Sequence, residues 1–365
     1  MSGEPQVVCR RAVTDSPGAN RPSYDQTMRY RRFGRSDLLV SEVGLGTWTL
    51  ASDWWGHVDD PDSLLYAALD AGITFIDTAP VYGKDGVGET LLAPLLAKHR
   101  DELVLTTKCG YDLAAERKGG AQNERPQDWK PKAVREQLEE SLTRLGTDRI
   151  DLYQLHNARI EPVLDDDLWA ELEALRSEGK VRELGVALGP AIGWVEEGVT
   201  AADRRPIVSL QTVFNVLEQE PGLTFANRPR VVDGECGLIS RVPHASDTLS
   251  GRVTPDTVFE PPDHRAHRNR DNMLDNFEKA STLSFLWAPE TGRTIGQAAV
   301  AGILANPAFT TVLPTVVSVE EIEEYAAASD LPLSESEHRR VDELFARNFD
   351  HADRYVMPLK SSAGN

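Results

Sequence analysis

The sequence predicts an α/β fold in the form of a closed (β/α)8 barrel, the TIM barrel. Short apolar runs alternate along the chain with longer amphipathic segments, which indicates βαβ units and a parallel sheet. Eight such runs are present, as a closed barrel requires. The residues GLGTW after the first run also lack the G-x-G-x-x-G spacing of the phosphate-binding turn in an open α/β sheet.

The strand candidates are short and end in polar or turn-forming residues. They cover residues 41–47, 74–79, 103–108, 150–156, 182–188, 207–215, 237–244 and 311–317. The helix candidates repeat apolar residues at every third or fourth position. They include residues 62–72, 88–101, 130–146, 166–180, 318–330 and 334–348. Two long connections, 109–131 after the third strand and 244–275 after the seventh, are expected to carry function, with disorder as the alternative.

A change in composition marks the start of the folded region. Residues 1–27 are polar, rich in Pro, Gly and Ser, and show no apolar period, so we expect a flexible leader. From Met28 the alternating pattern begins, and it continues almost to the end of the 365-residue chain. We therefore expect a single barrel domain over residues 28–360.

Charge and cysteine content limit the class of protein. A net charge of -19 argues against nucleic acid or an anionic membrane as a general partner, so any anionic ligand needs a local basic cluster. Cys9, Cys109 and Cys236 are widely spaced, which favours a reducing compartment and no zinc ribbon. No apolar run approaches the roughly 20 residues that span a bilayer, and the N-terminus lacks a signal-peptide core. These observations predict a cytoplasmic protein.

Polar residues terminate three consecutive strand candidates. Asp77 ends the second, Lys108 the third and His156 the fourth, and Tyr82 follows Asp77 in the connecting turn. Barrel enzymes build their sites at the carboxyl ends of the strands, so we expect these four side chains to meet at the barrel mouth. The alternatives are an ordinary Asp77–Lys108 salt bridge and a core position for His156.

The four residue types form an acid–base set. A tyrosine with a pKa of about 10 is a weak acid at neutral pH, and a neighbouring ammonium group stabilises the phenolate and lowers that pKa. Lys108 would supply the charge for Tyr82, and Asp77 would keep Lys108 charged and oriented. His156 would hydrogen-bond to a carbonyl oxygen and polarise it. The pattern therefore predicts proton transfer to or from a carbonyl or alcohol.

From Met28 onward the chain resembles the aldo-keto reductase family. The similar segments are MRYRRFGRSDLLVSEVGLGTW, GITFIDTAPVYG with GET, LTTK, DLYQLH, GKVRELGV, QTVFN and the last strand and helix. The resemblance implies an N-terminal β-hairpin before the barrel and hydride transfer between a nicotinamide cofactor and an aldehyde, ketone or alcohol. It places Asp77, Tyr82, Lys108 and His156 on the catalytic tetrad of the family, with Tyr82 as general acid.

The resemblance also implies two sets of contact residues. The cofactor set is Gly46, Thr47, Trp48, Asp77, Asn157, Gln211, Arg241, Pro243, His244, Thr315, Ser318, Glu321 and Glu324. The substrate set is Trp48, Trp54, Tyr82 and His156. Trp54 and Trp55 could also serve only for packing. No metal site is expected, because His264 and His267 lack a supporting Cys or carboxylate motif.

The nicotinamide side departs from the family pattern. The usual Ser-Asn pair after the fifth strand, which binds the carboxamide, is replaced by Ala187 and Leu188. Gln211 could still reach the carboxamide, and Asn215 keeps its motif position. Arg241 stands where the family often has a tyrosine that stacks on the nicotinamide ring. We expect Arg241 to contact the cofactor pyrophosphate or an acidic substrate.

The adenosine side bears on the choice between NAD and NADP. Members that use NADP place basic residues after the last strand, whereas this chain has Thr315 where lysine is common. Glu320, Glu321 and Glu324 follow at the start of the next helix, close to where a 2′-phosphate would bind. Carboxylates repel a phosphate and can accept a hydrogen bond from a ribose hydroxyl, so NAD is favoured over NADP. Ser318 is expected to cap that helix and could also contact adenosine.

The connection after the seventh strand contains a local basic run. Its members are His264, Arg265, His267, Arg268 and Arg270. One interpretation is a cationic lid over a phosphate- or carboxylate-bearing substrate. The alternative is a surface loop whose arginines pair with the acidic body of the protein.

Three functions remain open from the sequence. The first is a nicotinamide-dependent oxidoreductase on a small, sugar-like or anionic carbonyl compound or alcohol. The second is a lyase, isomerase or epimerase that uses Tyr82 and Lys108 for proton transfer without redox chemistry. The third is a binding or regulatory subunit, which the complete tetrad disfavours. The expected partner is a small molecule, and the expected state is a monomer or a small homo-oligomer.

Overall fold

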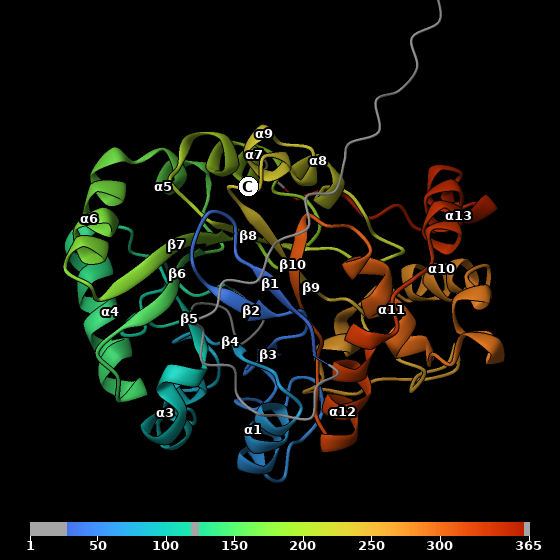
Figure 1. The fold of residues 1–365 in the computed structure, drawn as a ribbon, viewed down its shortest axis with the longest axis horizontal. Helices are drawn as coiled ribbons and strands as arrows, with labels where there is room; N and C mark the ends of the chain where they lie inside the picture. Colours follow the sequence, from blue (N-terminus) through green and yellow to red (C-terminus); the bar gives the residue numbers. More distant parts are fainter. Residues whose placement is uncertain (1–27, 118–123, 361–365) are drawn as a thin grey trace, which may run out of the picture.

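The computed structural model describes residues 28–117 and 124–360, so the expected leader, 1–27, lies outside the described residues. Eight parallel strands form the barrel in consecutive order (Figure 1). They are β3 (Leu45–Gly46), β4 (Phe75–Asp77), β5 (Val104–Cys109), β6 (Ile150–His156), β7 (Val181–Ala187), β8 (Ser209–Val213), β9 (Gly237–Arg241) and β10 (Phe309–Leu313). The barrel closes where the Gly44 amide donates to the Val312 carbonyl at 2.8 Å, which confirms the predicted fold.

An antiparallel hairpin precedes the barrel, as the resemblance implied. It consists of β1 (Tyr30–Arg32) and β2 (Leu39–Ser41). Phe33, Leu38 and Val40 of the hairpin are buried in one cluster with barrel residues such as Phe75 and Ile239. The rings of Phe33 and Phe75 lie 5.8 Å apart. The apolar side chains of the hairpin therefore contribute to the packed interior of the barrel.

Most of the helices surround the sheet and present an apolar stripe to it, whereas two near the C-terminus pack in a separate apolar cluster (Figure 1). The helices are α1 (Pro61–Asp70), α2 (Val87–Thr90), α3 (Ala93–His99), α4 (Pro131–Leu145), α5 (Ile160–Leu164), α6 (Asp166–Ser177), α7 (Val195–Arg204), α8 (Gly222–Ala226), α9 (Pro229–Val232), α10 (Arg270–Ser281), α11 (Ile295–Leu304), α12 (Val319–Ala327) and α13 (Glu335–Ala346). Helix α4 shows the principle: Val134, Leu138 and Leu145 are buried, and the helix ends at Gly146, whose φ is 65°. None of the helices among the described residues is long and apolar enough to cross a membrane.

Several barrel strands are shorter than the apolar runs that suggested them, and the first and seventh runs show why. The first run, 41–47, is divided, because Ser41 ends the hairpin and only Leu45–Gly46 joins the barrel. The seventh, 237–244, ends at Arg241. Val242 adopts a φ of 58°, and the next residue is a proline without an amide donor, so the ladder cannot continue.

Both long connections are present where the sequence predicted them. Residues 110–130 link β5 to α4, apart from the undescribed segment 118–123, and residues 242–269 link β9 to α10. The second connection is bound to the loop after β3. The Trp55 indole donates to Asp247 at 2.9 Å, and the His264 amide donates to the Trp54 carbonyl at 2.8 Å. The two loops thus form one wall beside the barrel mouth.

The described part of the C-terminal segment packs on α10 and then on the loop after β7. The buried Asp275 of α10 accepts hydrogen bonds from the backbone amides of Arg354 and Tyr355, at 2.8 and 3.1 Å. Further along, Lys360 pairs with the loop after β7: its carbonyl accepts from the Trp194 amide at 2.7 Å. The last described residue is therefore fixed beside the fifth strand of the barrel.

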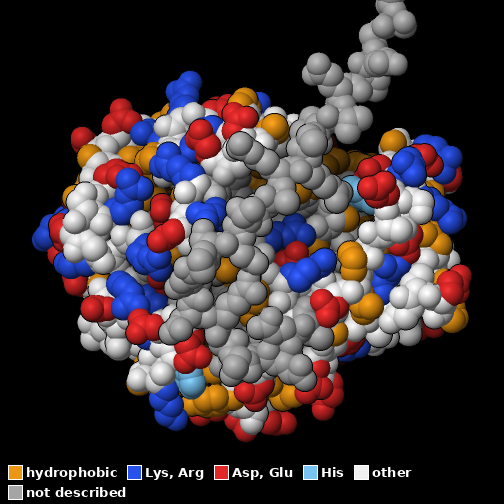
Figure 2. Space-filling view, in the orientation of Figure 1, with side chains coloured by type: hydrophobic (Ala, Val, Ile, Leu, Met, Phe, Trp, Pro, Cys, Tyr) orange, Lys and Arg blue, Asp and Glu red, His pale blue; other side chains and the backbone are white. Residues whose placement is uncertain are grey.

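The surface and the cysteines agree with the composition. On the face shown in Figure 2, the described basic and acidic side chains are intermixed over the barrel helices. Cys109 and Cys236 are buried, free thiols, and burial raises the pKa of each to about 12. Both therefore behave as small apolar core residues.

Candidate active site

The carboxyl ends of three neighbouring strands deliver the predicted acid–base residues. Asp77 ends β4, Lys108 lies near the end of β5 and His156 ends β6. Tyr82 lies in the turn after β4, where its amide donates to the Ala79 carbonyl. The turn requires Gly83: its φ is 75°, and a β-carbon there would collide with the carbonyl oxygen of Ala51. This tight turn directs the Tyr82 side chain back towards the strand ends.

Lys108 is the centre of the arrangement. Its fully buried Nζ donates to Asp77 Oδ2 at 2.7 Å, to the Thr78 carbonyl at 2.8 Å and to Tyr82 Oη at 3.0 Å. An ammonium group has three donors, so every one of them has an acceptor. The salt bridge that the sequence left as an alternative is present, and the tyrosine shares the same ammonium group.

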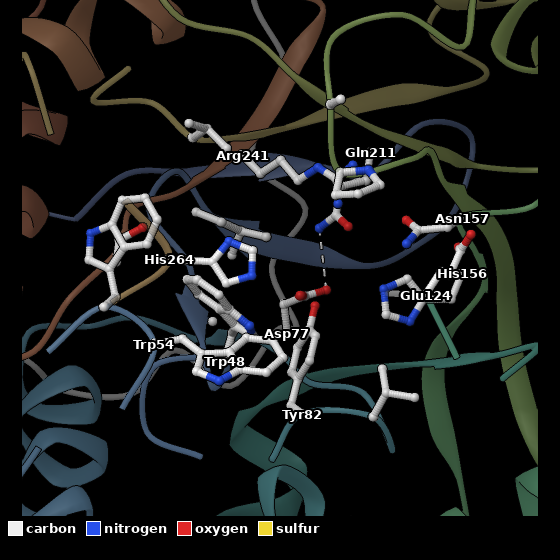
Figure 3. A pocket seen from close by; sticks show the side chains of 18 of the residues that line it. Trp48, Trp54, Asp77, Tyr82, Glu124, His156, Asn157, Gln211, Arg241 and His264 are labelled. Carbon is white, nitrogen blue, oxygen red and sulfur yellow. Dashed lines mark hydrogen bonds between the residues drawn. The ribbon is translucent and has the colours of Figure 1, made fainter. Parts of the chain in front are cut away.

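Two glutamines complete the surroundings of Asp77. The side-chain amides of Gln154 and Gln211 both donate to Asp77 Oδ1, each at 3.4 Å. The contact with Gln211 is visible in Figure 3. Both carboxylate oxygens of the buried Asp77 therefore accept hydrogen bonds from side chains.

The pKa directions define the protonation states. Burial lowers the pKa of Lys108, but Asp77 and Tyr82 outweigh that effect and raise it overall. Burial raises the pKa of Tyr82, and the opposing effect of Lys108 is smaller, so the phenol pKa lies above its usual value. The sequence predicted a lowered phenol pKa. The lowering contribution of Lys108 is present, but the low polarity of the surroundings exceeds it.

His156 is held neutral beside the tyrosine. Burial and the charges of Lys108 and Arg241 place its pKa well below the usual range. Its ring stands edge-on to Tyr82 at 5.9 Å and to Tyr111 at 5.1 Å between centroids. The ring atom Nδ1 is buried and has no hydrogen-bond partner. A neutral imidazole in this position can donate a hydrogen bond to an uncharged oxygen of a ligand.

A cavity of about 510 Å3 opens above these residues (Figure 3). Its size matches sites for small molecules and cofactors. The predicted residues that line it are Gly46, Trp48, Trp54, Asp77, Tyr82, His156, Asn157, Gln211, Arg241 and Thr315. The structure thus brings most of the predicted catalytic, substrate and nicotinamide residues to one surface.

Six predicted cofactor residues lie outside the cavity lining: Thr47, Pro243, His244, Ser318, Glu321 and Glu324. The Thr47 hydroxyl donates to Thr78 at 2.7 Å beneath the site. His244 is buried, stacks on Tyr325 at 4.3 Å between centroids and lies 3.2 Å from the Gly296 carbonyl. Ser318 caps α12 by accepting from the Glu321 amide. Cofactor contacts for these residues remain predictions.

An arginine that the sequence did not single out lies beside the predicted adenosine residues. Arg252, in the loop after β9, lies 2.8 Å from Glu321 and 3.4 Å from Glu324, and it donates to Tyr325 Oη at 2.7 Å. Glu321 is buried and also accepts from the Val317 amide at 2.6 Å. Because Arg252 offsets part of the negative charge here, the carboxylates alone do not set the potential at the start of α12.

The Arg241 side chain binds backbone carbonyls at residues 188 and 189, in the segment that departs from the family pattern. Its guanidinium donates to the carbonyls of Leu188, at 2.5 Å, and Gly189. Its Nε is buried without a partner, and Figure 3 shows the side chain extending over Asp77 towards Gln211. Asn215 stabilises the turn beyond Arg241 by donating to the Val242 carbonyl at 3.1 Å. Asn215 therefore has a structural role next to the site.

A chain of contacts that the sequence did not reveal joins three loops. Asn157 donates to Tyr111 Oη at 2.7 Å, Tyr111 donates to Glu124 at 2.5 Å, and Arg159 lies 2.5 Å from the other oxygen of Glu124. The Arg159 guanidinium stacks on Trp194 at 4.4 Å. Tyr111 and Glu124 fall in the long connection that the sequence marked as functional. Trp194 carries no local signal.

The basic run after the seventh strand divides between the two expected roles. His264 and Arg268 line the cavity. Arg265 instead pairs with Asp263 and Asp247 and covers Trp55, at 4.8 Å from the ring centroid. Arg270 donates to backbone carbonyls within the same loop. Two members of the run therefore line the cavity, and Arg265 and Arg270 stabilise the loop that contains them.

Comparisons with known proteins agree with the site. The family model described as "Aldo/keto reductase family" matches residues 42–346. An NADH-specific methylglyoxal reductase of Escherichia coli (strain K12) is 30% identical over 332 residues, 85% of this chain and 96% of that protein. The structure resembles glycerol dehydrogenase AKR11B4 from Gluconobacter oxydans, with a TM-score of 0.74, 26% identity, and coverage of 90% of this chain and 99% of that one. It also resembles the holo form of aldo-keto reductase AKR11C1 from Bacillus halodurans, with a TM-score of 0.69, 26% identity, and coverage of 87% and 96%.

Proposed function

Because this chain belongs to the aldo/keto reductase family, we propose that it reduces a small aldehyde or ketone with a nicotinamide cofactor, and that Tyr82 is the proton donor. The observation that carries the proposal is the contact of the Lys108 ammonium group with both Asp77 and Tyr82, at 2.7 and 3.0 Å. A phenol next to a positive charge can give up its proton and remain stabilised as a phenolate.

Each of the four acid–base residues has its own role in the proposed reduction of the carbonyl group. The cofactor, when bound, supplies the hydride that adds to the carbonyl carbon. Tyr82 transfers its proton to the carbonyl oxygen, and Lys108 stabilises the phenolate that results. Neutral His156 donates a hydrogen bond to the same oxygen and orients the substrate. Asp77 keeps Lys108 charged. In the reverse direction Tyr82 accepts the proton from the alcohol.

The cavity contains groups that fit a nicotinamide. A carboxamide offers two N–H donors and one carbonyl acceptor. Oδ1 of Asn157 is buried without a partner, and Gln211 lines the cavity beside Asp77. Together they supply an acceptor and an amide that can replace the missing Ser-Asn pair. Arg241 and Arg268 offer positive charge for the cofactor phosphates on the same side of the cavity.

We propose NAD(H) as the preferred cofactor. Thr315 offers no charge to a 2′-phosphate, and Arg252 already interacts with Glu321 and Glu324. A 2′-phosphate would have to compete with these carboxylates for Arg252. The similar Escherichia coli protein is described as NADH-specific, which supports the same choice.

The substrate is proposed to be a small oxygenated carbonyl compound. Trp48, Trp54 and Tyr111 give the cavity apolar walls beside the proton donor. The similar proteins act on methylglyoxal and glycerol by their names, and both compounds have three carbons. No feature of the described residues favours a non-redox lyase or isomerase over reduction.

The test is a titration of the full chain with NADH and NADPH, followed by cofactor oxidation with methylglyoxal, glyceraldehyde and dihydroxyacetone. We expect quenching of tryptophan fluorescence by NADH at a lower concentration than by NADPH, and turnover with at least one carbonyl compound. Cofactor binding without any turnover would favour a sensor or a non-redox enzyme. No response to either dinucleotide would overturn the proposal.

A further inference from the structure

The cavity is positively charged in a strongly acidic protein. The chain has a net charge of -19, yet the basic residues that line the cavity are Arg117, Arg125, Arg159, Arg241, Arg268 and Lys360. The acidic residues in the same lining are Asp77 and Glu124. Both already have cationic partners, because Asp77 pairs with Lys108 at 2.7 Å and Glu124 with Arg159 at 2.5 Å. The described lining therefore has a surplus of basic over acidic side chains.

This surplus extends beyond the side proposed for the cofactor. Gln211, Arg241 and Thr315 come from β8, β9 and the end of β10. Arg117 and Arg125 come from the connection after β5, on the opposite arc of the barrel. A cofactor that extends over β8 to β10 lies away from Arg117 and Arg125. These two residues therefore face the substrate.

Arg125 is positioned to bind an anion. Its Nη1 donates to the carbonyls of Leu113 and Ala115, at 3.1 and 2.8 Å, so the side chain is fixed. Its Nε is buried and has no hydrogen-bond partner, and no described carboxylate lies within ion-pair distance of the guanidinium. Burial and the charge of Arg125 lower the pKa of Arg117. The charges of Arg117 and Arg125 are therefore close enough to interact.

Lys360 adds a second cation from a distant part of the chain. Its backbone pairs with the loop after β7, by donating to the Ile192 carbonyl at 2.9 Å and accepting from the Trp194 amide at 2.7 Å. The exposed side chain lines the cavity and forms no ion pair with a described carboxylate. The backbone is thus held in place while the ammonium group stays available to a ligand.

We propose that the substrate carries an anionic group, a phosphate monoester or a carboxylate, which Arg125 and Lys360 bind while the carbonyl group lies against Tyr82. The inference rests on the proposed function and specifies its substrate class. Charge-assisted hydrogen bonds from guanidinium and ammonium groups are the strongest that side chains offer to such anions. The remaining wall of the cavity, with Trp48 and Trp54, would contact the carbon chain between the two groups.

The test compares matched substrates that differ in one anionic group. The pairs are glyceraldehyde 3-phosphate with glyceraldehyde, and succinic semialdehyde with butanal. The measured quantity is the ratio of kcat/KM for the anionic member to that for the neutral member. We expect a ratio of about ten or more in one pair at least, and a fall of about tenfold to a hundredfold in that ratio for Arg125→Gln. The pair that shows the preference identifies phosphate or carboxylate.

Two further variants control for folding and for bulk charge. Lys360→Gln changes an exposed side chain that forms no ion pair with a described carboxylate, so it should lower the ratio without lowering the melting temperature. Lys130→Gln removes a charge near α4 that lies outside the cavity and pairs with Asp128 at 3.6 Å, so it should leave the ratio unchanged.

Three results would overturn the inference. The first is a ratio near one for both pairs in the unmodified protein, and the second is an unchanged ratio in folded Arg125→Gln and Lys360→Gln. The third is weaker NADH binding in these variants at an unchanged ratio, which would assign the cations to the cofactor phosphates. Failure of the proposed function looks different, because then neither member of either pair is reduced with NADH or NADPH.

Discussion

Replacing Tyr82 by phenylalanine tests the central chemical assignment. The substitution removes one oxygen atom and leaves Lys108 with its contacts to Asp77 and the Thr78 carbonyl, at 2.7 and 2.8 Å. Lys108 therefore stays charged and in place. The lost hydrogen bond should lower the free energy of unfolding by about 0.5–1.5 kcal/mol, a small part of the stability of a domain. The variant is thus expected to fold and to bind NADH as the unmodified protein does.

The effect on turnover should be much larger than the effect on stability. Loss of a positioned general acid typically costs a factor of about 10²–10⁴, which corresponds to roughly 3–5 kcal/mol in the activation free energy. Tyr111→Phe is the matched control, because Tyr111 also stands edge-on to His156 but donates to Glu124 and has no contact with Lys108. We expect Tyr111→Phe to change KM and to change kcat by less than about tenfold.

The assay is stopped-flow oxidation of NADH under single-turnover conditions, which isolates hydride and proton transfer from product release. A Tyr82→Phe rate within about fivefold of the unmodified rate would refute the assignment, because no general acid of the stated strength would then have been removed. Equal losses in both tyrosine variants would also refute it, since they would show a shared effect on His156 or on packing.

Three other predictions concern pH, cofactor choice and the C-terminal segment. The pKa of Tyr82 is raised, and its protonated form is the proton donor. The kcat for reduction should therefore stay level from about pH 6 to 9 and fall only above that range. A break near pH 7 in the pH–rate profile would contradict this prediction. Glu321→Gln releases Arg252 for a 2′-phosphate and should shift kcat/KM towards NADPH by about tenfold relative to NADH, whereas an unchanged ratio would place the 2′-position elsewhere. Asp275→Asn weakens the contacts that hold the C-terminal segment, so it should lower the free energy of unfolding by about 2–3 kcal/mol, measured by denaturant titration. It should also raise the KM for the carbonyl substrate, measured by steady-state kinetics, because the same segment positions Lys360. Burial raises the pKa of Asp275, but bonds from the C-terminal segment outweigh it and lower the pKa to about 2, so this stability is fully present above about pH 4 and is lost towards pH 2.

The sequence was sufficient to predict the barrel and the meeting of the acid–base residues. Strand order is consecutive, so residues that end neighbouring strands must lie together whatever the loops do. Asp77 and Lys108 therefore followed from pattern alone. The protonation state of Tyr82 did not, because it depends on how much protein surrounds the phenol as well as on the nearest charge.

Loop residues were beyond prediction for a different reason. Lys360 reaches the cavity through backbone pairing with Trp194, and Arg252 meets Glu321 through a long connection. Neither contact leaves a periodic pattern or a local motif, because both partners are far apart in the sequence. The basic run after β9 illustrates the limit: its charge was visible, but which of its members face the cavity depended on Asp247 and Asp263.

The two departures from the family pattern on the nicotinamide side are physically connected. Leu188 follows the fifth barrel strand and Arg241 ends the seventh, so the sequence presents them as separate losses. In the structure the Arg241 guanidinium donates to the carbonyls of Leu188 and Gly189, and it therefore binds backbone atoms of the segment whose side chains no longer carry polar groups. Backbone carbonyls are present whatever the side chain, which explains why an apolar leucine is tolerated there. The Arg241 side chain therefore links the ends of the fifth and seventh barrel strands at the wall of the cavity.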